Sequence, residues 1–295
     1  MERVCLICNP TAKSGEASRT AKQVIELLRA RGVEPCVYET AYAGHATELS
    51  KHAYDEGYRL IAAVGGDGTM RETALPLLHT DAVFGLIPCG TGNDFARALG
   101  ISTDPEIAVD TLLCGTDRML DAGQANDEIF FNVAGFGFDV DVLDYTEAFK
   151  PKFQNGSTAY IFGLLKAVFG LKLRRSTITF PDGAIEENVL LIAAGNGRFF
   201  GGGMEVTPNA DPADGLLDFC IIHDVGFWGV LTVLPKFIKG KHLGSKYVSY
   251  RKDRCCSVVC EPQSRIEVDG ERMQGTPVTF RILEKALRVR LPKLG

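Results

Sequence analysis

The sequence predicts an N-terminal parallel α/β domain followed by an antiparallel β-sandwich domain, with an active site in the cleft between them. Strand-like and helical patterns alternate over the first 120 residues. Two glycine-rich turns there each join a short apolar run to a helix, and short β-rich runs dominate after about residue 121. Alternating strands and helices indicate a parallel sheet covered by helices. We expect domains of residues 1–121 and 122–295, and leave open whether the last strand packs back on the first domain.

The first domain is predicted from apolar periodicity and helix-ending signals. Apolar runs of four to six residues read as buried strands, and Val24, Ile25, Leu27 and Leu28 give one helix its apolar face. Gly57 is placed to end another helix. In order, we expect a strand at 4–8, a helix at 17–31, a strand at 34–39, a helix at 46–56, a strand at 59–64, a helix from Met70, a strand at 83–87, and helices at 95–99 and 105–113.

Two loops of this domain carry the main functional signal. The first contains Gly65, Gly66, Asp67, Gly68 and Thr69. The second runs from Gly90 through Thr91, Gly92 and Asn93 to Asp94. Glycine turns before helices present bare backbone N–H groups to an anion, which is how phosphate is bound. Asp67 and Asp94 stand where Mg²⁺ or ordered water on those phosphates would need a carboxylate. The pattern predicts a nucleotide-using phosphotransferase.

Short β-rich runs separated by Gly, Pro, Asn and Asp define the second domain, which is typical of an antiparallel sandwich. We expect strands at 128–133, 176–180, 188–193, 217–222, 257–261, 265–268, 278–283 and 286–291, and helical insertions near 158–171 and 226–239.

Composition narrows the class of protein. A net charge of −5 and a pI near 5.6 argue against nucleic-acid binding. The N-terminus lacks the features of a signal peptide, and no apolar stretch reaches the roughly 18 to 20 residues of a membrane span. We expect a cytoplasmic protein. The nine cysteines are odd in number and scattered through apolar runs, so we expect packing roles, including for the Cys5–Cys8 pair.

A third loop, residues 9–15, follows the first strand and supplies an amide, a lysine and small residues at the same sheet edge. Alone it is ordinary turn chemistry, but here it can complete a phosphate site. The chain has no GxxxxGK[ST] motif and no GxGxxG motif opening a helix. The sequence therefore supports neither a Walker A loop nor a dinucleotide-binding Rossmann site.

Together these motifs resemble the diacylglycerol-kinase catalytic family, and most closely its soluble bacterial lipid-kinase branch. The resemblance continues in order through the second half, covering nearly the whole chain. Its further motifs are Phe131-Asn132, Gly135 to Asp139, Asn196, Gly201 to Gly203, Pro208, Asp214 to Asp218, and Asp269-Gly270-Glu271.

The resemblance implies ATP and Mg²⁺ as cofactors and assigns roles to individual residues. Asp67 and Asp94 would organise Mg²⁺ and water, and Asp269 or Glu271 would take the proton from the acceptor hydroxyl. Spacing does not separate these two acids; Glu271 is the favoured acceptor, with Asp269 as its partner. A further structural metal would be bound by Asp211, Asp214 and the carbonyl of Leu216. The ATP site would be lined by Asn9, Pro10, Thr11, Ala12, Lys13, Thr40, Gly65, Gly66, Asp67, Gly68, Thr69, Met70, Arg71 and Thr91.

Ordinary structural explanations exist for several of these motifs. Asp-Gly between strands is a hairpin signal, so Asp269-Gly270-Glu271 alone would be read as a turn. Asp211 and Asp214 fit an Asx turn as well as a metal loop. The apolar stretches 160–169 and 227–238, followed by basic residues, fit either core helices or helices resting transiently on an anionic membrane surface.

The predicted function is an ATP- and Mg²⁺-dependent lipid kinase, with diacylglycerol as the leading acceptor and phosphatidic acid as the product. Phosphatidylglycerol, sphingoid bases and polyprenols stay open as acceptors, as does homodimerisation through an exposed strand edge. The alternatives are an NAD kinase, a phosphofructokinase, and a lipid-binding protein that has lost catalysis. The last should have lost a cleft carboxylate or a loop glycine, yet Asp67, Asp94, Asp269 and Glu271 are all present.

Overall fold

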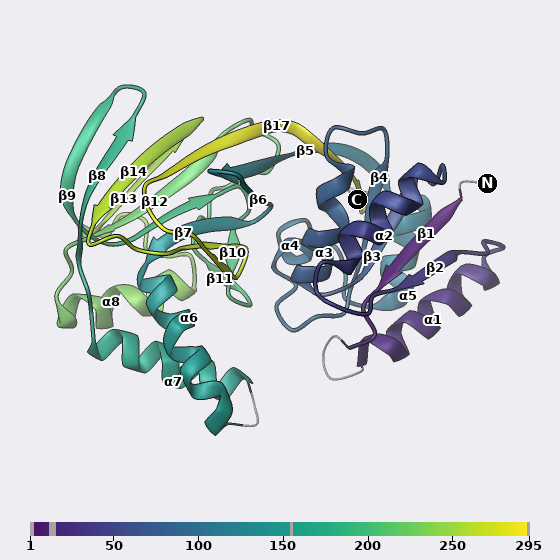
Figure 1. The fold of residues 1–295 in the computed structure, drawn as a ribbon, viewed down its shortest axis with the longest axis horizontal. Helices are drawn as coiled ribbons and strands as arrows, with labels where there is room; N and C mark the ends of the chain where they lie inside the picture. The colour runs from purple at the N-terminus through teal and green to yellow at the C-terminus, as the bar shows by residue number, and fades with distance from the viewer. Residues whose placement is uncertain (1–2, 12–15, 154–155, 294–295) are drawn as a thin grey trace.

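The chain forms two lobes joined by long strands, in a computed structural model that describes residues 3–11, 16–153 and 156–293. In Figure 1 the lobe with the N-terminus lies on the right and the β-rich lobe on the left. Strands β5 (Thr116–Ala125) and β17 (Val278–Leu291) pass between them along the top of the view. The predicted fold class, a parallel α/β domain followed by an antiparallel β-sandwich, is confirmed.

Four parallel strands in the order β2-β1-β3-β4 form the centre of the α/β lobe. The helices α1 and α5 pack on one face of this sheet and α2, α3 and α4 on the other. The bounds of these elements are β1 Val4–Cys8, α1 Glu16–Ala30, β2 Cys36–Glu39, α2 His45–Asp55, β3 Leu60–Gly65, α3 Asp67–Ala74, η2 Leu75–Leu77, β4 Val83–Pro88, α4 Asp94–Ala98 and α5 Pro105–Cys114.

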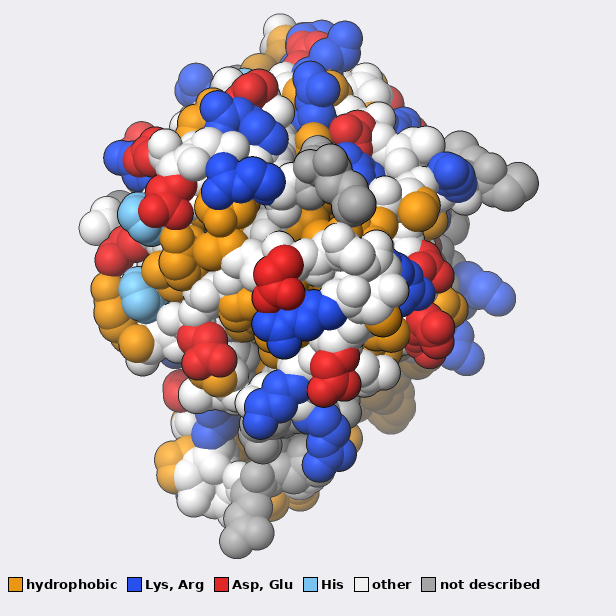
Figure 2. Space-filling view, turned by 90° about the vertical axis from the view of Figure 1, so that its right-hand side faces the viewer, with side chains coloured by type: hydrophobic (Ala, Val, Ile, Leu, Met, Phe, Trp, Pro, Cys, Tyr) orange, Lys and Arg blue, Asp and Glu red, His pale blue; other side chains and the backbone are white. Residues whose placement is uncertain are grey.

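The strands of this lobe are buried on both sides, which explains their uninterrupted apolar sequences. One expectation was wrong. Helix α3 begins at Asp67 rather than Met70, because the Met70 amide already donates a helical hydrogen bond to the Gly66 carbonyl, at 2.9 Å. The first glycine loop therefore becomes the first helical turn. The face of this lobe seen in Figure 2 carries acidic and basic side chains interspersed, without an extended area of one sign.

The β-rich lobe contains only antiparallel pairings among its described strands. Its interior is filled by aromatic and branched side chains from facing strands, including Phe136, Phe219 and Phe280. The remaining elements are β6 Glu128–Phe130, β7 Val133–Gly137, α6 Phe138–Phe149, η3 Lys150–Lys152, α7 Gly156–Phe169, β8 Arg174–Phe180, β9 Gly183–Gly195, β10 Phe199–Phe200, β11 Met204–Glu205, β12 Leu217–His223, α8 Phe227–Ile238, β13 Val248–Asp253, β14 Cys255–Glu261, β15 Ile266–Val268 and β16 Glu271–Met273.

Several second-half expectations need correction. The strand expected at 128–133 is two strands, β6 and β7, separated at Phe131-Asn132. The strands expected at 278–283 and 286–291 are one strand, β17, with a register shift between Leu283 and Leu287. The helix α6 and the strands β5, β10, β11, β13 and β16 were not predicted from the sequence.

Strand β17 belongs to both lobes. It pairs with β14 and β5 in an antiparallel sense, and with β4 of the α/β lobe in a parallel sense at Val289 and Phe84. At the register shift, the buried carboxylate of Asp121 accepts hydrogen bonds from the amides of Lys285, at 2.7 Å, and Gly215, at 2.8 Å. One aspartate thus fixes the bend of the strand that joins the lobes.

Helices α6, α7 and α8 cover the lower side of the β-rich lobe in Figure 1. The inner faces of α7 and α8 pack on β7, β9 and β12 through Val168, Val230, Val233 and Phe237. Of the helices in the described residues, none is both long and apolar enough to cross a membrane.

We predict that Asp121→Asn destabilises the protein by about 1–3 kcal/mol, because an amide can accept only one of the two buried backbone hydrogen bonds. Urea unfolding measures the difference. Asp127→Asn, at an exposed position of the β5–β6 turn, is the matched control and should be neutral. Equal stabilities of the two variants would contradict the role given to Asp121.

Candidate active site

The sheet brings the two glycine loops into direct contact. Strands β3 and β4 are parallel neighbours, and their last residues, Gly65 and Pro88, lie opposite each other. A Cβ atom added at Gly90 would lie 2.4 Å from the Gly66 Cα atom. Only glycine lets the two turns approach this closely. The loops therefore form one continuous edge of exposed backbone at the carboxyl ends of the strands, where open α/β sheets bind ligands.

A cavity of about 280 Å³ lies on the outer side of the first loop. Its lining includes five of the residues predicted for the nucleotide site, namely Asn9, Thr11, Thr40, Gly68 and Thr69. The Asn9 amide donates a hydrogen bond to the Thr69 hydroxyl at 3.2 Å, which ties the loop after β1 to the first turn of α3. The structure thus assembles residues from three separate segments around one polar cavity.

The other predicted nucleotide residues lie in different surroundings. Gly65 and Met70 are buried under the loop, Gly66 and Pro10 are half-buried, and Thr91 is exposed in the second loop. Ala12 and Lys13 lie outside the described residues.

A second cavity, of about 150 Å³, brings together carboxylates from both halves of the chain. Asp67 and Asp94 come from the α/β lobe and Asp269 from the loop after β15. Asp67 accepts a hydrogen bond from the Phe95 amide at 3.3 Å, and Asp94 accepts one from the Gly202 amide at 2.8 Å. The Asp94–Gly202 bond crosses from one lobe to the other, so this cavity is a cleft between them.

The electrostatics of the cleft favour a cation. Burial is the main cause that raises the pKa of Asp94, and the neighbouring Asp67 charge adds to it. One carboxylate oxygen of Asp94, Oδ1, is buried without a hydrogen-bond partner among the described residues, and the Nε atom of Arg97 lies 4.0 Å from it. Converging carboxylates with an oxygen atom that accepts no hydrogen bond are the donor set that Mg²⁺ prefers. The residues present therefore fit a divalent cation at this point.

Asp269 fixes the backbone of residues 131–133 on the β-rich side of the cleft. Its carboxylate accepts hydrogen bonds from three successive backbone amides, Phe131 at 2.7 Å, Asn132 at 2.9 Å and Val133 at 3.2 Å. Its backbone is in the left-handed region, with φ of 47°. Burial raises its pKa to about 6, although the three amides and Arg71 act in the opposite direction.

Glu271 has different surroundings from Asp269. Its side chain is 53% exposed, does not line the cleft cavity, and lies 3.5 Å from the guanidinium group of Arg71. Arg71 itself is buried and donates to the Ile129 carbonyl at 3.1 Å and the Glu128 carboxylate at 3.1 Å. Arg71, predicted to line the nucleotide site, therefore uses its donors to bind the β-rich lobe.

The loop predicted to hold a structural metal has internal partners. Asp214 Oδ1 accepts from the Leu216 amide at 3.0 Å, and its Oδ2 atom is paired with Lys252 at 2.6 Å. Asp211 accepts from the Ala213 amide at 3.1 Å and lies 3.6 Å from Arg118. Across the described ranges, no group of three or more His, Cys, Asp or Glu side chains is arranged to hold a metal ion. The Asp211, Asp214 and Leu216 site stays a prediction.

Two residues that shape the site were not found from the sequence. Asp121 braces the 211–216 loop through Gly215, and the fully buried Glu267 lies beside the cleft. Both belong to strands, where an acidic side chain is normally read as solvent-facing. Only the three-dimensional packing reveals that these two are buried.

Comparison with known proteins accounts for nearly the whole chain. The sequence profile described as "Diacylglycerol kinase catalytic domain" matches residues 3–125, and the one described as "YegS C-terminal NAD kinase beta sandwich-like domain" matches residues 132–291. The chain is 30% identical to a diacylglycerol kinase of Bacillus subtilis, over 99% of this chain and 97% of that protein. It is 33% identical to a YegS-like lipid kinase of Pseudomonas aeruginosa, over 99% of this chain and 95% of that protein.

Solved structures agree on the fold. A structure from Bacillus anthracis overlays with a TM-score of 0.82 at 24% identity, covering 99% of this chain and 98% of the other. A second structure from that organism, of a diacylglycerol kinase, overlays with a TM-score of 0.76 at 21% identity, covering 99% and 97%. The two-lobe arrangement is therefore shared by proteins of quite different sequence.

We predict a stability change with pH that depends on Asp269. Its folded-state pKa of about 6 lies above the ordinary value near 3.8. An acid whose pKa is raised by folding costs the native state free energy once it ionises, so stability falls as the pH rises from about 4 to about 6 and is level above. Relative to Asp269→Asn, the wild type should lose unfolding free energy across this window in urea titrations. A difference that is constant or grows with pH would contradict the assignment.

Proposed function

Because this chain belongs to the diacylglycerol kinase family and is a lipid kinase, we propose that it transfers the γ-phosphoryl group of ATP to the free hydroxyl of diacylglycerol. The product would be phosphatidic acid. The observation that carries the proposal is that the first glycine loop borders both cavities, with Asp67 in the interlobe cleft of carboxylates and Gly68 and Thr69 in the polar cavity. A phosphoryl donor and an acceptor hydroxyl could meet there.

ATP would bind along the edge formed by the two glycine loops. The 280 Å³ cavity offers amide and hydroxyl groups for the nucleoside from Asn9, Thr11 and Thr40. Exposed backbone amides of both loops would receive the phosphates, whose charge suits glycine turns and a helix start. Phosphoryl transfer needs mainly positioning and charge neutralisation, and these loops provide the positioning.

Mg²⁺ fits the carboxylates of Asp67 and Asp94, and when bound there it would neutralise the charge of the transferring phosphate. Backbone amides of the chain would fix the orientation of these two carboxylates. The Gly202 amide fixes one oxygen of Asp94, and the Phe95 amide fixes one oxygen of Asp67. Both carboxylates therefore present their remaining oxygens from rigid positions.

Asp269 is the better placed of the two candidate bases. It lines the cleft, whereas Glu271 is half-exposed and faces Arg71. A carboxylate has about four acceptor positions, so three backbone amides leave one for the acceptor hydroxyl. A pKa of about 6 also brings this acid closer to neutral pH, where a general base is most effective. We assign the role of proton acceptor to Asp269. Glu271 and Arg71 would have a structural role, as an ion pair beside the cleft.

The lipid would be reached at a membrane surface through α7 and α8. Phe169 at the end of α7 is 75% exposed and Trp228 at the start of α8 is 78% exposed. Phe227 stacks on Phe169 at 5.6 Å, which joins the two ends into one apolar patch. Lys166 and Lys236 lie exposed on the same helices and would favour anionic lipids.

Arg174, which follows α7 and was expected among its basic residues, is instead buried and forms an ion pair with Asp141 at 2.8 Å.

Kinase activity should be lost on removal of the cleft carboxylates. With ATP, Mg²⁺ and lipids in mixed micelles, we expect diacylglycerol to be phosphorylated, and both Asp67→Ala and Asp269→Asn to lower kcat by on the order of 10²–10⁴-fold. The kcat of Glu271→Gln should stay within about tenfold of the wild-type value, since this change only weakens the half-exposed ion pair with Arg71.

Sphingosine, phosphatidylglycerol, a polyprenol and NAD would be offered in parallel as acceptors. Phosphorylation of NAD alone would reject the lipid acceptor, and a collapse of activity in Glu271→Gln with Asp269→Asn active would reverse the assignment of the base. Far-UV circular dichroism and urea unfolding show that each variant is folded, independently of its affinity for ATP.

Membrane binding should depend on the patch at α7 and α8. Sedimentation with vesicles of anionic phospholipid and diacylglycerol should show about tenfold weaker binding for Phe169→Ser and for Trp228→Ser, because each variant loses an exposed aromatic side chain that would become buried in the membrane. Ile107→Ser, which removes an exposed apolar side chain from α5 of the other lobe, is the matched control. An equal loss in the control, or none in the patch, would reject this surface.

A further inference from the structure

An apolar cavity beside the cleft is lined by a fully buried acid, Glu267, that the proposed chemistry does not use. The cavity measures about 30 Å³ and lies between the helices α6, α7 and α8 and the strands β7 and β9. Its lining is aliphatic and aromatic except for Asp139, Tyr160 and Glu267. A second apolar cavity of about 30 Å³ under α8 shares Phe138, Leu191, Leu234 and Phe237 with the first. The space beneath α8 is therefore incompletely packed.

Glu267 lines this space and has one carboxyl oxygen without a hydrogen-bond partner among the described residues. The side chain has no solvent exposure. Its Oε1 atom accepts a hydrogen bond from the Gly270 amide, and its Oε2 atom has no partner among the described residues. An unsatisfied buried polar atom costs about 1–3 kcal/mol, so a group left in this state suggests a missing ligand.

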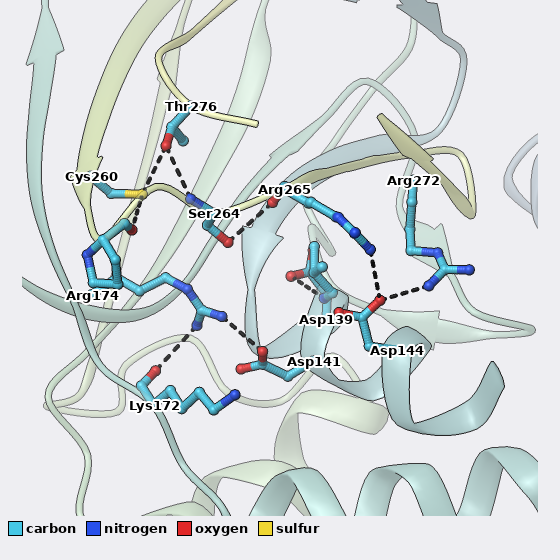
Figure 3. Close-up of polar contacts among 12 residues, drawn as sticks. Asp139, Asp141, Asp144, Lys172, Arg174, Cys260, Ser264, Arg265, Arg272 and Thr276 are labelled. Carbon is cyan, nitrogen blue, oxygen red and sulfur yellow. Dashed lines mark hydrogen bonds and ion pairs between the residues drawn. The ribbon is translucent and has the colours of Figure 1, made fainter. Parts of the chain in front are cut away.

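The surroundings of Glu267 also disfavour a negative charge on its carboxyl group. Burial is the main cause that raises its pKa well above the ordinary value, and the charges of Asp139, Asp269 and Asp94 add to it. The arginines nearby are used elsewhere, as Figure 3 shows: Arg174 pairs with Asp141, and Arg265 and Arg272 pair with Asp144. An uncharged carboxyl group can donate a hydrogen bond as well as accept one.

The cavity adjoins the site where the acceptor hydroxyl would react. Phe200 lines both this cavity and the cleft. Gly270, which donates to Glu267, also lines the cleft next to Asp269. In a 1,2-diacylglycerol the carbon with the free hydroxyl is bonded directly to a carbon with an ester. A hydroxyl at Asp269 would therefore bring an ester group toward Glu267 and its acyl chain toward the apolar cavity.

We propose that Glu267 selects glycerol esters by donating a hydrogen bond from its carboxyl group to an ester carbonyl of the lipid, while the attached acyl chain enters the apolar space under α8. This inference rests on the proposed function. A volume of 30 Å³ holds about one water molecule, so the chain takes its place by moving α8 away from the sheet and merging the two cavities. Glu267 would act as a specificity residue and not as an acid or base.

The test compares an ester with its ether analogue, which lacks the carbonyl. Dioctanoylglycerol and dioctylglycerol ether are offered in the same micelles, and the ratio of their kcat/KM values is measured for each variant. This ratio does not depend on the fraction of folded enzyme. Wild type should prefer the ester by about tenfold, the worth of one buried hydrogen bond. Glu267→Gln, whose amide also donates, should keep the preference, and Glu267→Leu should reduce the ratio to near one.

Each other outcome overturns the proposal in a distinct way. If wild type phosphorylates neither glyceride, the proposed function fails and this inference falls with it. If wild type uses both but shows no ester preference, or Glu267→Leu keeps it, Glu267 does not contact the carbonyl. If Glu267→Gln loses the ester preference, the Glu267 carboxyl group does not act as a hydrogen-bond donor. If wild type phosphorylates sphingosine and Glu267→Gln does not, Glu267 acts as a charged acceptor. Glu186→Gln, an exposed change on β9, is the control and should match wild type.

Discussion

The structure depends on one strand that is shared between the lobes. Strand β17 pairs with β14 and β5 on one side and reaches β4 on the other, so the two lobes form one hydrogen-bonded body. Asp121 fixes the bend of this strand with both carboxylate oxygens. A cleft between lobes joined only by a linker would vary in width, whereas this connection sets its geometry. The carboxylates on facing walls can then act on one reacting centre, because catalysis requires positions accurate to fractions of an ångström.

Charge is the second constraint on the site. Asp94, Asp269 and Glu267 are gathered in a region of little solvent, and in each case burial is the main cause of a raised pKa. Such a cluster is unfavourable unless a cation or proton neutralises it. The cleft and the cavity beside it therefore combine acids suited to different tasks. Two can share a divalent cation, one has a pKa of about 6 and can take a proton, and the fourth, Glu267, lies against an apolar wall that disfavours its ionisation.

The sequence predicts those parts of the molecule in which local pattern and final environment agree. Strands buried on both faces, such as β3 and β4, read directly as apolar runs, and the glycine loops follow from the close approach that only glycine allows. It does not reveal α6, which follows directly on strand β7 within one apolar stretch. Nor does it show β17 as one strand, since Glu284 and Lys285 at the bend resemble a turn.

The site shows the same division between local and long-range information. Asp67 and the glycines beside it are recognisable because their chemistry lies in consecutive residues. Asp269 and Glu271 could not be separated by spacing, since their different surroundings come from the backbone of 131–133 and from Arg71, more than 130 and 190 residues earlier in the chain. Glu267 was missed because its burial depends on how α6 to α8 pack on the sheet.

The most direct measurement is a crystal structure with Mn²⁺, a non-hydrolysable ATP analogue and a short-chain diacylglycerol, using the anomalous signal of manganese. We expect a manganese ion bound by Asp67 and Asp94 at the phosphates, with the nucleoside in the cavity beside Asn9 and the glycerol hydroxyl within hydrogen-bond distance of Asp269. Phosphates bound away from the two glycine loops, or an acceptor hydroxyl next to Glu271 on the far side of Arg71, would show that the active site lies elsewhere.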